Sequence, residues 1–172
     1  MKVHYNLKDL PPFKHGVITT GAFDGVHRGH QKIIISMQEI AQAIEGETII
    51  ITFHPHPRKV TSSVPGEIKQ LTSLNERIKL LDQLGIDHLV VVPFDYHFSN
   101  LTAEAYLQEF LVAHFHPHTI IVGYDHRFGK GRIGNFEMLQ NYGQQLGFIV
   151  EQINEQLIGD EIISSTHIRE YL

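Results

Sequence analysis

The sequence contains no cysteine among its 172 residues. Disulfide bonds, zinc–thiolate sites and a thiol nucleophile are therefore excluded as sources of stability or of catalysis. The chain also lacks an apolar run long enough to span a membrane, and its first residues lack the apolar segment of a signal peptide. With no targeting or membrane segment visible, the expected location of the protein is the cytoplasm.

Positive charge is scarce, because 14 Lys and Arg face 19 Asp and Glu and give a formal net charge of −5. Extended nucleic-acid surfaces need an excess of basic residues, so neither nucleic acid nor a membrane is expected as a partner. Small anionic ligands remain compatible with this charge if basic groups gather locally. The length, the 42% apolar content and the absence of repeats predict one globular domain over residues 1–172.

Apolar, β-branched segments alternate along the chain with amphipathic ones. We expect strands over residues 16–20, 47–53, 88–93, 119–122 and 148–153. We expect helices over residues 29–45, 73–84, 102–113, 136–146 and 165–172, and a loop over residues 58–71. This alternation predicts an α/β fold, a Rossmann-like doubly wound parallel sheet, whose ligands bind beyond the carboxyl ends of the strands.

The strongest functional signal is the segment GAFDGVHRGH, residues 21–30, which lies between the first expected strand and the first expected helix. Its small residues let the backbone approach a bulky anion, and a helix N-terminus attracts phosphate through free N–H groups and its dipole. His27 and His30 form the HxGH pattern of nucleotidyltransferases and add two imidazoles where a phosphate gains charge during reaction. The bland alternative is a pair of helix-start histidines that only cap or pack. Asp24 either caps the turn or hydrogen-bonds a nucleotide.

Three further segments follow expected strands. The segment TFHPHPR, residues 52–58, predicts a stiff wall beside the site. The segment GYDHRFGKGRIG, residues 123–134, contains a literal GxGxxG, but its first glycine does not directly follow the preceding strand. We therefore interpret it as a basic loop rather than a dinucleotide fingerprint. The segment ISSTHIR, residues 163–169, is typical of a helix N-cap, and the same hydroxyls and N–H groups suit a polyphosphate.

In this order the four segments resemble the adenylyltransferase (FAD synthetase) module of the bacterial bifunctional riboflavin kinase/FMN adenylyltransferases. The resemblance spans residues 16–169. It implies an HxGH-type nucleotidyltransferase fold and transfer of AMP from ATP to the phosphate of FMN, which gives FAD and pyrophosphate with Mg²⁺ accompanying ATP. It also implies a C-terminally fused riboflavin kinase domain, which residues 1–172 do not contain, so we expect no kinase activity from them.

The resemblance and the motifs together assign the site residues. The expected catalytic residues are His27, His30 and Arg169. The expected ATP-binding residues are Gly21, Phe23, Asp24, His27, His30, Ser164, Ser165, Thr166 and Arg169. The expected flavin-binding residues are His56, Asp125, Arg127 and Phe128, and no residue is expected to ligate a metal. His126 departs from the family pattern, which often has an aromatic residue there.

Two other functions remain open from the sequence. One is adenylyl transfer to another phosphorylated acceptor, such as nicotinamide mononucleotide or pantetheine phosphate. The other is a non-catalytic module that binds a nucleotide or a flavin and regulates a partner.

Overall fold

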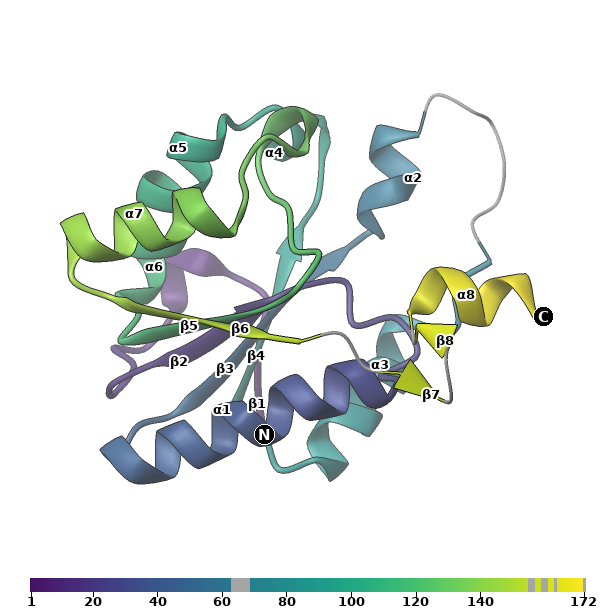
Figure 1. Cartoon of the computed structure of the whole chain (residues 1–172), viewed down its shortest axis with the longest axis horizontal. Coiled ribbons are helices and arrows are strands. Elements are labelled where there is room, and N and C mark those ends of the chain that lie inside the picture. The colour runs from purple at the N-terminus through teal and green to yellow at the C-terminus, as the bar shows by residue number, and fades with distance from the viewer. Residues whose placement is uncertain (63–68, 155–156, 159–160, 163, 172) are drawn as a thin grey trace.

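A six-stranded parallel sheet forms the centre of the computed structural model, which describes residues 1–62, 69–154, 157–158, 161–162 and 164–171 (Figure 1). The strand order is β1-β4-β3-β2-β5-β6, and every neighbouring pair is parallel. The strands are β1 (Lys2–His4), β2 (Val17–Thr20), β3 (Thr48–His54), β4 (His88–Pro93), β5 (Thr119–Gly123) and β6 (Ile149–Ile153). A short antiparallel pair, β7 (Leu157–Ile158) and β8 (Glu161–Ile162), follows the sheet.

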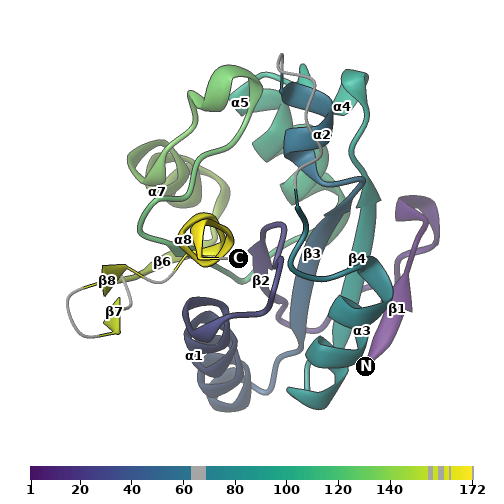
Figure 2. The ribbon, with the colours of Figure 1, turned by 90° about the vertical axis from the view of Figure 1, so that its right-hand side faces the viewer.

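Helices cover both faces of the sheet, as the near-continuous apolar strands predict (Figures 1 and 2). One face carries α1 (Arg28–Ile44) and α3 (Leu74–Gln83), and Ile50 of β3 belongs to the core cluster on that side. The other face carries α7 (Phe136–Leu146) and a continuous helical stretch built from α5 (Ala103–Ala105), the π-helical η2 (Tyr106–Val112) and α6 (Ala113–Phe115). Ile49 and Ile51 belong to that second cluster, so alternate residues of one strand fill two cores. The predicted α/β fold is confirmed.

The strand order creates a crevice between β2 and β5. From β2 the chain continues to β3 and β4 on one side of the sheet, whereas β5 and β6 lie on the other side. Neighbouring strands whose connections leave in opposite directions open a crevice at their carboxyl ends, where open α/β sheets bind ligands. Helix α8 (Ser165–Glu170) lies beside the loop that follows β2, at the same end of the sheet (Figure 2).

The structure departs from the sequence prediction at short elements. The expected loop 58–71 begins with the helix α2 (Pro57–Thr61), because proline suits the first helical turn and the His56 ring accepts the Arg58 N–H. Residues 63–68 of that loop lie outside the described part of the chain. The strand β1, the helix α4 (Tyr96–Ser99) and the 3-10 turns η1 (Leu7–Asp9) and η3 (Lys130–Arg132) were not predicted, since such short elements show no periodicity.

The remaining expected elements agree with the structure to within about two residues, the usual uncertainty of element ends. Leu172, the last residue of the final expected helix, lies outside the described residues. Over the described parts of the chain, we find no helix with both the length and the apolar character needed to cross a bilayer.

We expect Gly143→Ala to destabilise the fold. A Cβ at position 143 would lie 2.6 Å from the Phe148 carbonyl oxygen and 3.2 Å from two carbons of its ring. Overpacking of this kind costs about 1–3 kcal/mol, which outweighs the gain of about 1 kcal/mol from the higher helix propensity of alanine. Urea unfolding measures the change. Gln144→Ala, at the exposed neighbouring position, is the control, and equal stability of the two variants would contradict the prediction.

Candidate active site

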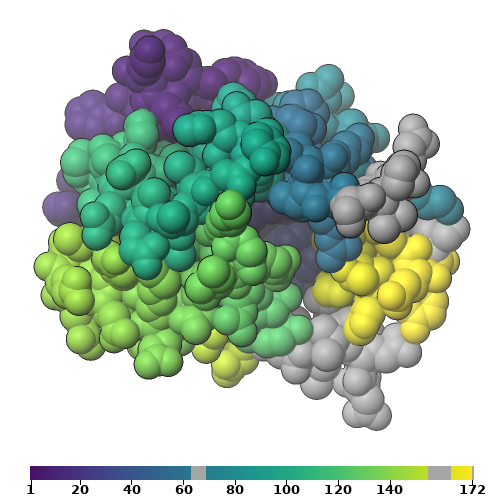
Figure 3. Space-filling model, turned by 90° about the horizontal axis from the view of Figure 1, so that it is seen from above, coloured from purple at the N-terminus to yellow at the C-terminus, as the bar shows by residue number. Residues whose placement is uncertain are grey.

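A cavity of about 710 Å³ opens at the carboxyl ends of β2 and β5. Figure 3 shows the surface hollowed between the segment that follows β5 and the yellow helix α8. The parts of the chain that line the cavity include the loop after β2, the start of α1, the start of α2, the loop after β5 and α8. The structure brings all the sequence-predicted site residues to this cavity: Gly21, Phe23, Asp24, His27, His30, His56, Asp125, Arg127, Phe128, Ser164, Ser165, Thr166 and Arg169.

The loop between β2 and α1 turns sharply through left-handed backbone. Phe23, Gly25 and Val26 have φ values of 50°, 81° and 40°. This conformation costs residues other than glycine roughly 1–3 kcal/mol each and persists only where surrounding contacts enforce it. The first intrahelical bond of α1 runs from the Gln31 N–H to the His27 carbonyl, so earlier N–H groups of the first turn lack a helical partner. The turn therefore presents backbone donors at the edge of the cavity.

His27 and His30 stack face to face in this first turn. Their ring centroids lie 3.7 Å apart at 22°, and the Phe23 ring lies 4.7 Å from that of His30. Burial lowers the pKa of His27 and lowers the pKa of His30 well below its usual value. Both Nδ1 atoms are buried without a hydrogen-bond partner among the described residues. The two rings are therefore mainly neutral, and they lie side by side in the lining of the cavity.

The Asp24 carboxylate forms its hydrogen bonds with other residues of the chain. It is 1% exposed and accepts hydrogen bonds from the N–H groups of Leu71 and Thr72, at 3.1 and 2.9 Å, and from the Arg169 guanidinium. Burial raises the pKa of Asp24, but these hydrogen bonds more than offset burial and hold it below its ordinary value. Ser165 Oγ donates to the Asp24 carbonyl at 2.8 Å. Asp24 thus joins the loop after β2 to α8, which favours the turn-stabilising role over a direct nucleotide contact.

Helix α8 has an ordinary cap as well as a place on the cavity wall. Ser164 Oγ accepts the His167 N–H, as the cap interpretation of the motif predicts. The Arg58 guanidinium reaches from α2 and donates to Thr166 Oγ1 at 3.1 Å, so α2 and α8 meet across the cavity. Arg58 was not among the predicted site residues, although it ends the TFHPHPR motif. Its charge, with that of Arg169, makes this side of the cavity basic.

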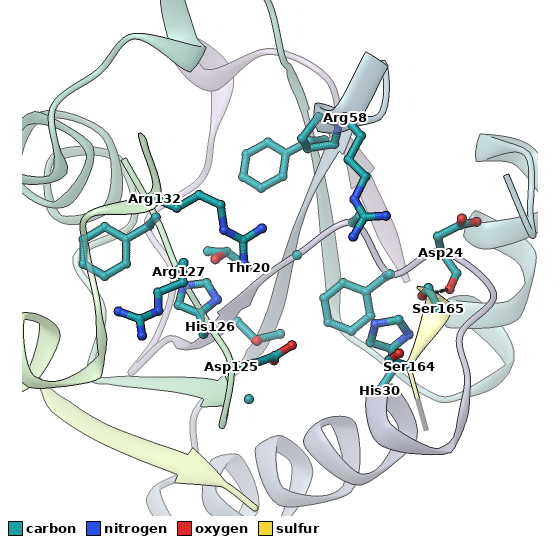
Figure 4. Close-up of a pocket in the computed structure, with 18 of the residues that line it drawn as sticks. Thr20, Asp24, His30, Arg58, Asp125, His126, Arg127, Arg132, Ser164 and Ser165 are labelled. Atoms are coloured by element: carbon teal, nitrogen blue, oxygen red, sulfur yellow. Dashed lines mark hydrogen bonds between the residues drawn. The ribbon is translucent and has the colours of Figure 1, made fainter. Parts of the chain in front are cut away.

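The predicted flavin-binding residues divide into exposed and buried ones. Asp125 and Arg127 are exposed on the loop after β5 (Figure 4). His56 is only 6% exposed, its Nδ1 caps α2, and burial lowers its pKa to about 4. Phe128 is 5% exposed and stacks on Tyr106, with ring centroids 5.4 Å apart. His56 and Phe128 therefore support the wall from behind.

An apolar wall that the motifs did not predict borders the same region. It consists of Phe53, Phe94, Phe98 and Tyr106, which all line the cavity. Tyr106 donates its hydroxyl to Thr20 Oγ1 at 3.2 Å. His126 packs near Phe128 at 5.9 Å between ring centroids, and burial lowers its pKa to about 4, so it behaves as a neutral ring. No single motif signals this wall, because its residues come from four separate elements or loops. The cavity combines a polar end with an aromatic surface.

No group of three or more His, Asp or Glu side chains in the described part of the chain is placed to hold a metal ion. A divalent ion bound here would therefore take most of its ligands from its substrate and from water.

Comparison with known proteins identifies relatives. The FAD synthetase family model matches residues 11–167. The bifunctional riboflavin kinase/FMN adenylyltransferase of Escherichia coli K12 is 35% identical over 170 residues, which are 98% of this chain and 53% of the relative. The chain thus spans about half the length of this curated relative.

Solved structures share the fold. A Streptococcus pneumoniae protein described as a macrolide-efflux protein matches with a TM-score of 0.84 and 25% identity over 98% of this chain and 54% of its own. The pantoate–β-alanine ligase of Francisella tularensis matches with a TM-score of 0.62 and 13% identity over 98% of this chain and 73% of its own. At this identity the ligase shows likeness of fold alone. The extent of the family match, and the site that its motifs build, show that this chain belongs to the FAD synthetase family.

Proposed function

We propose that this chain is an FMN adenylyltransferase, which transfers AMP from ATP to the phosphate of FMN and releases pyrophosphate. The observation that carries the proposal is the stacked His27–His30 pair, which lies at the start of α1 and lines the cavity. Family membership supports the choice of substrates. A phosphate oxygen of FMN attacks the α-phosphorus of ATP, and the bond from that phosphorus to the bridging oxygen of pyrophosphate breaks.

The protein acts mainly by holding two anions in line and by stabilising charge that spreads in the transition state. His27 and His30 donate N–H groups to the α- and β-phosphates as neutral imidazoles. Gly21 and Phe23 line the nucleotide side. Because no covalent intermediate forms, the rate depends on how well these donors are preorganised.

Helix α8 holds the β- and γ-phosphates in this proposal. The Thr166 hydroxyl accepts from Arg58, which leaves its own hydrogen free to point at a phosphate. Ser164 Oγ accepts the His167 N–H, so its hydroxyl hydrogen can likewise point at a phosphate, whereas Ser165 contributes through its backbone N–H because its hydroxyl donates to the Asp24 carbonyl. Arg169 neutralises charge while Asp24 fixes its orientation.

The flavin ring occupies the aromatic side of the cavity. Asp125 and Arg127 border it from the loop after β5, and His56 and Phe128 support it from behind. A Mg²⁺ ion accompanying ATP would neutralise part of the phosphate charge, and it would be held mainly by ATP and water, because the described residues contain no cluster that could hold it.

We also propose that residues 1–172 form one domain that carries adenylyl transfer without kinase activity, and that its place of action is the cytoplasm. A riboflavin kinase domain is the expected partner, because the curated relative is described as bifunctional and the chain matches about half of it.

Incubation of the purified chain with Mg²⁺, ATP and FMN should yield FAD and pyrophosphate, resolved by chromatography. A parallel reaction with riboflavin and ATP should yield no FMN. Nicotinamide mononucleotide and pantetheine phosphate, offered in place of FMN, serve as controls for the acceptor. Transfer to either of these and not to FMN would contradict the proposed substrate, and ligand binding without any transfer would contradict the proposed activity.

Replacing either stacked histidine should slow the reaction while leaving the fold intact. Loss of one preorganised donor costs about 3 kcal/mol of barrier, so kcat of His27→Ala or His30→Ala should fall roughly a hundredfold. His97→Ala removes an exposed histidine outside the cavity and is the matched control. A kcat near that of the wild type in either variant would remove that residue from the mechanism, and circular dichroism confirms that each variant is folded.

Both stacked histidines should be less protonated in the folded protein at pH 6.5 than an unperturbed histidine. Burial lowers their pKa values, whereas an unperturbed imidazole is half protonated there. The unfolded chain then binds more protons below pH 6.5, so stability should fall as the pH drops from 6.5 toward the folded pKa values. Titration of the ring resonances by NMR measures this, with His30→Gln to assign one of the two rings. A titration midpoint at or above 6.5 for either ring would show that a charged imidazole occupies the site.

A further inference from the structure

Arg77 is a buried cation beneath the proposed active site. It lies on the inner face of α3, in line with Leu74, Ile78 and Leu81, and it is 1% exposed. A position with this spacing normally carries an apolar residue. The mechanism above does not use Arg77, and the side chain does not line the cavity.

The Arg77 guanidinium has few partners. One of its terminal nitrogens donates to Thr52 Oγ1 at 3.2 Å, and its Nε has no hydrogen-bond partner among the described residues. In the same part of the chain it forms no ion pair. The carboxylate whose charge acts on it is Asp24, which is already paired with Arg169. Two buried or nearly buried guanidinium groups thus share one carboxylate.

Two successive hydrogen bonds connect Arg77, through Thr52, to the loop that follows β2. Because a guanidinium only donates, Thr52 Oγ1 accepts from Arg77 and donates its own hydrogen to the Ala22 carbonyl at 3.2 Å. Ala22 belongs to the loop of residues 21–26, called the phosphate loop below, whose strained turn leads to His27. The charge of Arg77 also contributes to the lowered pKa values of His30 and His56, which both line the cavity.

A buried charge without an ionic partner is costly, and apolar residues of similar volume often replace such groups without loss of stability. The folded state alone therefore does not account for Arg77. An anion bound in the cavity would supply the missing compensation, because opposite charges attract strongly across a medium of low dielectric constant.

We propose that Arg77 is a positioning residue of the anion site: it holds the phosphate loop through Thr52 and keeps a permanent positive charge beneath it for a polyphosphate ligand. The proposal rests on the proposed function only in naming ATP as that ligand.

The test compares Arg77→Met and Arg77→Lys with Lys79→Met, which removes the same charge from an exposed position of the same helix. Calorimetry with inorganic pyrophosphate measures the Kd at two salt concentrations, and thermal unfolding measures the Tm. Arg77→Met should weaken binding about tenfold and reduce its salt dependence, with the Tm unchanged or raised. Arg77→Lys should bind within about threefold of the wild type, and Lys79→Met should bind as the wild type does. In the reaction with ATP, Arg77→Met should raise KM more than it lowers kcat.

An unchanged Kd together with a lower Tm in Arg77→Met would show a merely structural residue and overturn the proposal. A wild-type chain that does not bind pyrophosphate would also overturn it. If Arg77→Met does not fold, Thr52→Ala breaks the hydrogen-bonded chain and Thr52→Ser preserves it; equal pyrophosphate affinity of these two variants would overturn the proposal. FAD formation by the wild type decides the proposed function separately, so pyrophosphate binding without FAD would reject that function and leave Arg77 to be judged by affinity.

Discussion

The buried carboxylate of Asp24 is the interaction on which the rest of the site depends. It accepts hydrogen bonds from Leu71, Thr72 and Arg169, and therefore connects the loop after β2, the segment before α3 and the helix α8. These segments are far apart in the sequence, and the cavity exists only where they meet. Without this anchor, the left-handed turn at Phe23 and Val26 would lose the contacts that enforce its strain.

Charge is distributed unevenly over the molecule. The chain as a whole is acidic, with a formal net charge of −5, yet Arg58, Arg127, Arg132 and Arg169 all line the cavity. Such local concentration gives a small anion a favourable destination without creating the extended basic surface that nucleic acids require. The fold therefore gathers basic groups in one place, which an acidic chain needs in order to bind a small anion.

The long, periodic elements and the place of the site could be predicted from the sequence, because apolar periodicity sets the sheet and the sheet sets its crevice. The particular partners could not be predicted. His56 and Phe128 lie in motifs, but whether a motif residue faces the ligand or the core depends on tertiary packing, and both are largely buried. The sequence pattern did not indicate a role for Arg77, since a single arginine among the apolar residues of a helix face does not by itself point to a function. The roles assigned to the site residues stay predictions.

The contact between Asp24 and Arg169 spans 145 residues of sequence. During synthesis from the N-terminus, the strands and helices of the sheet emerge before α8 does, and domains acquire structure as their chain becomes available. A nascent chain can thus hold most of its core while one wall of the cavity is still missing. The cavity is complete only once α8 has emerged, so an incomplete chain would lack the side of the cavity that Arg169 lines.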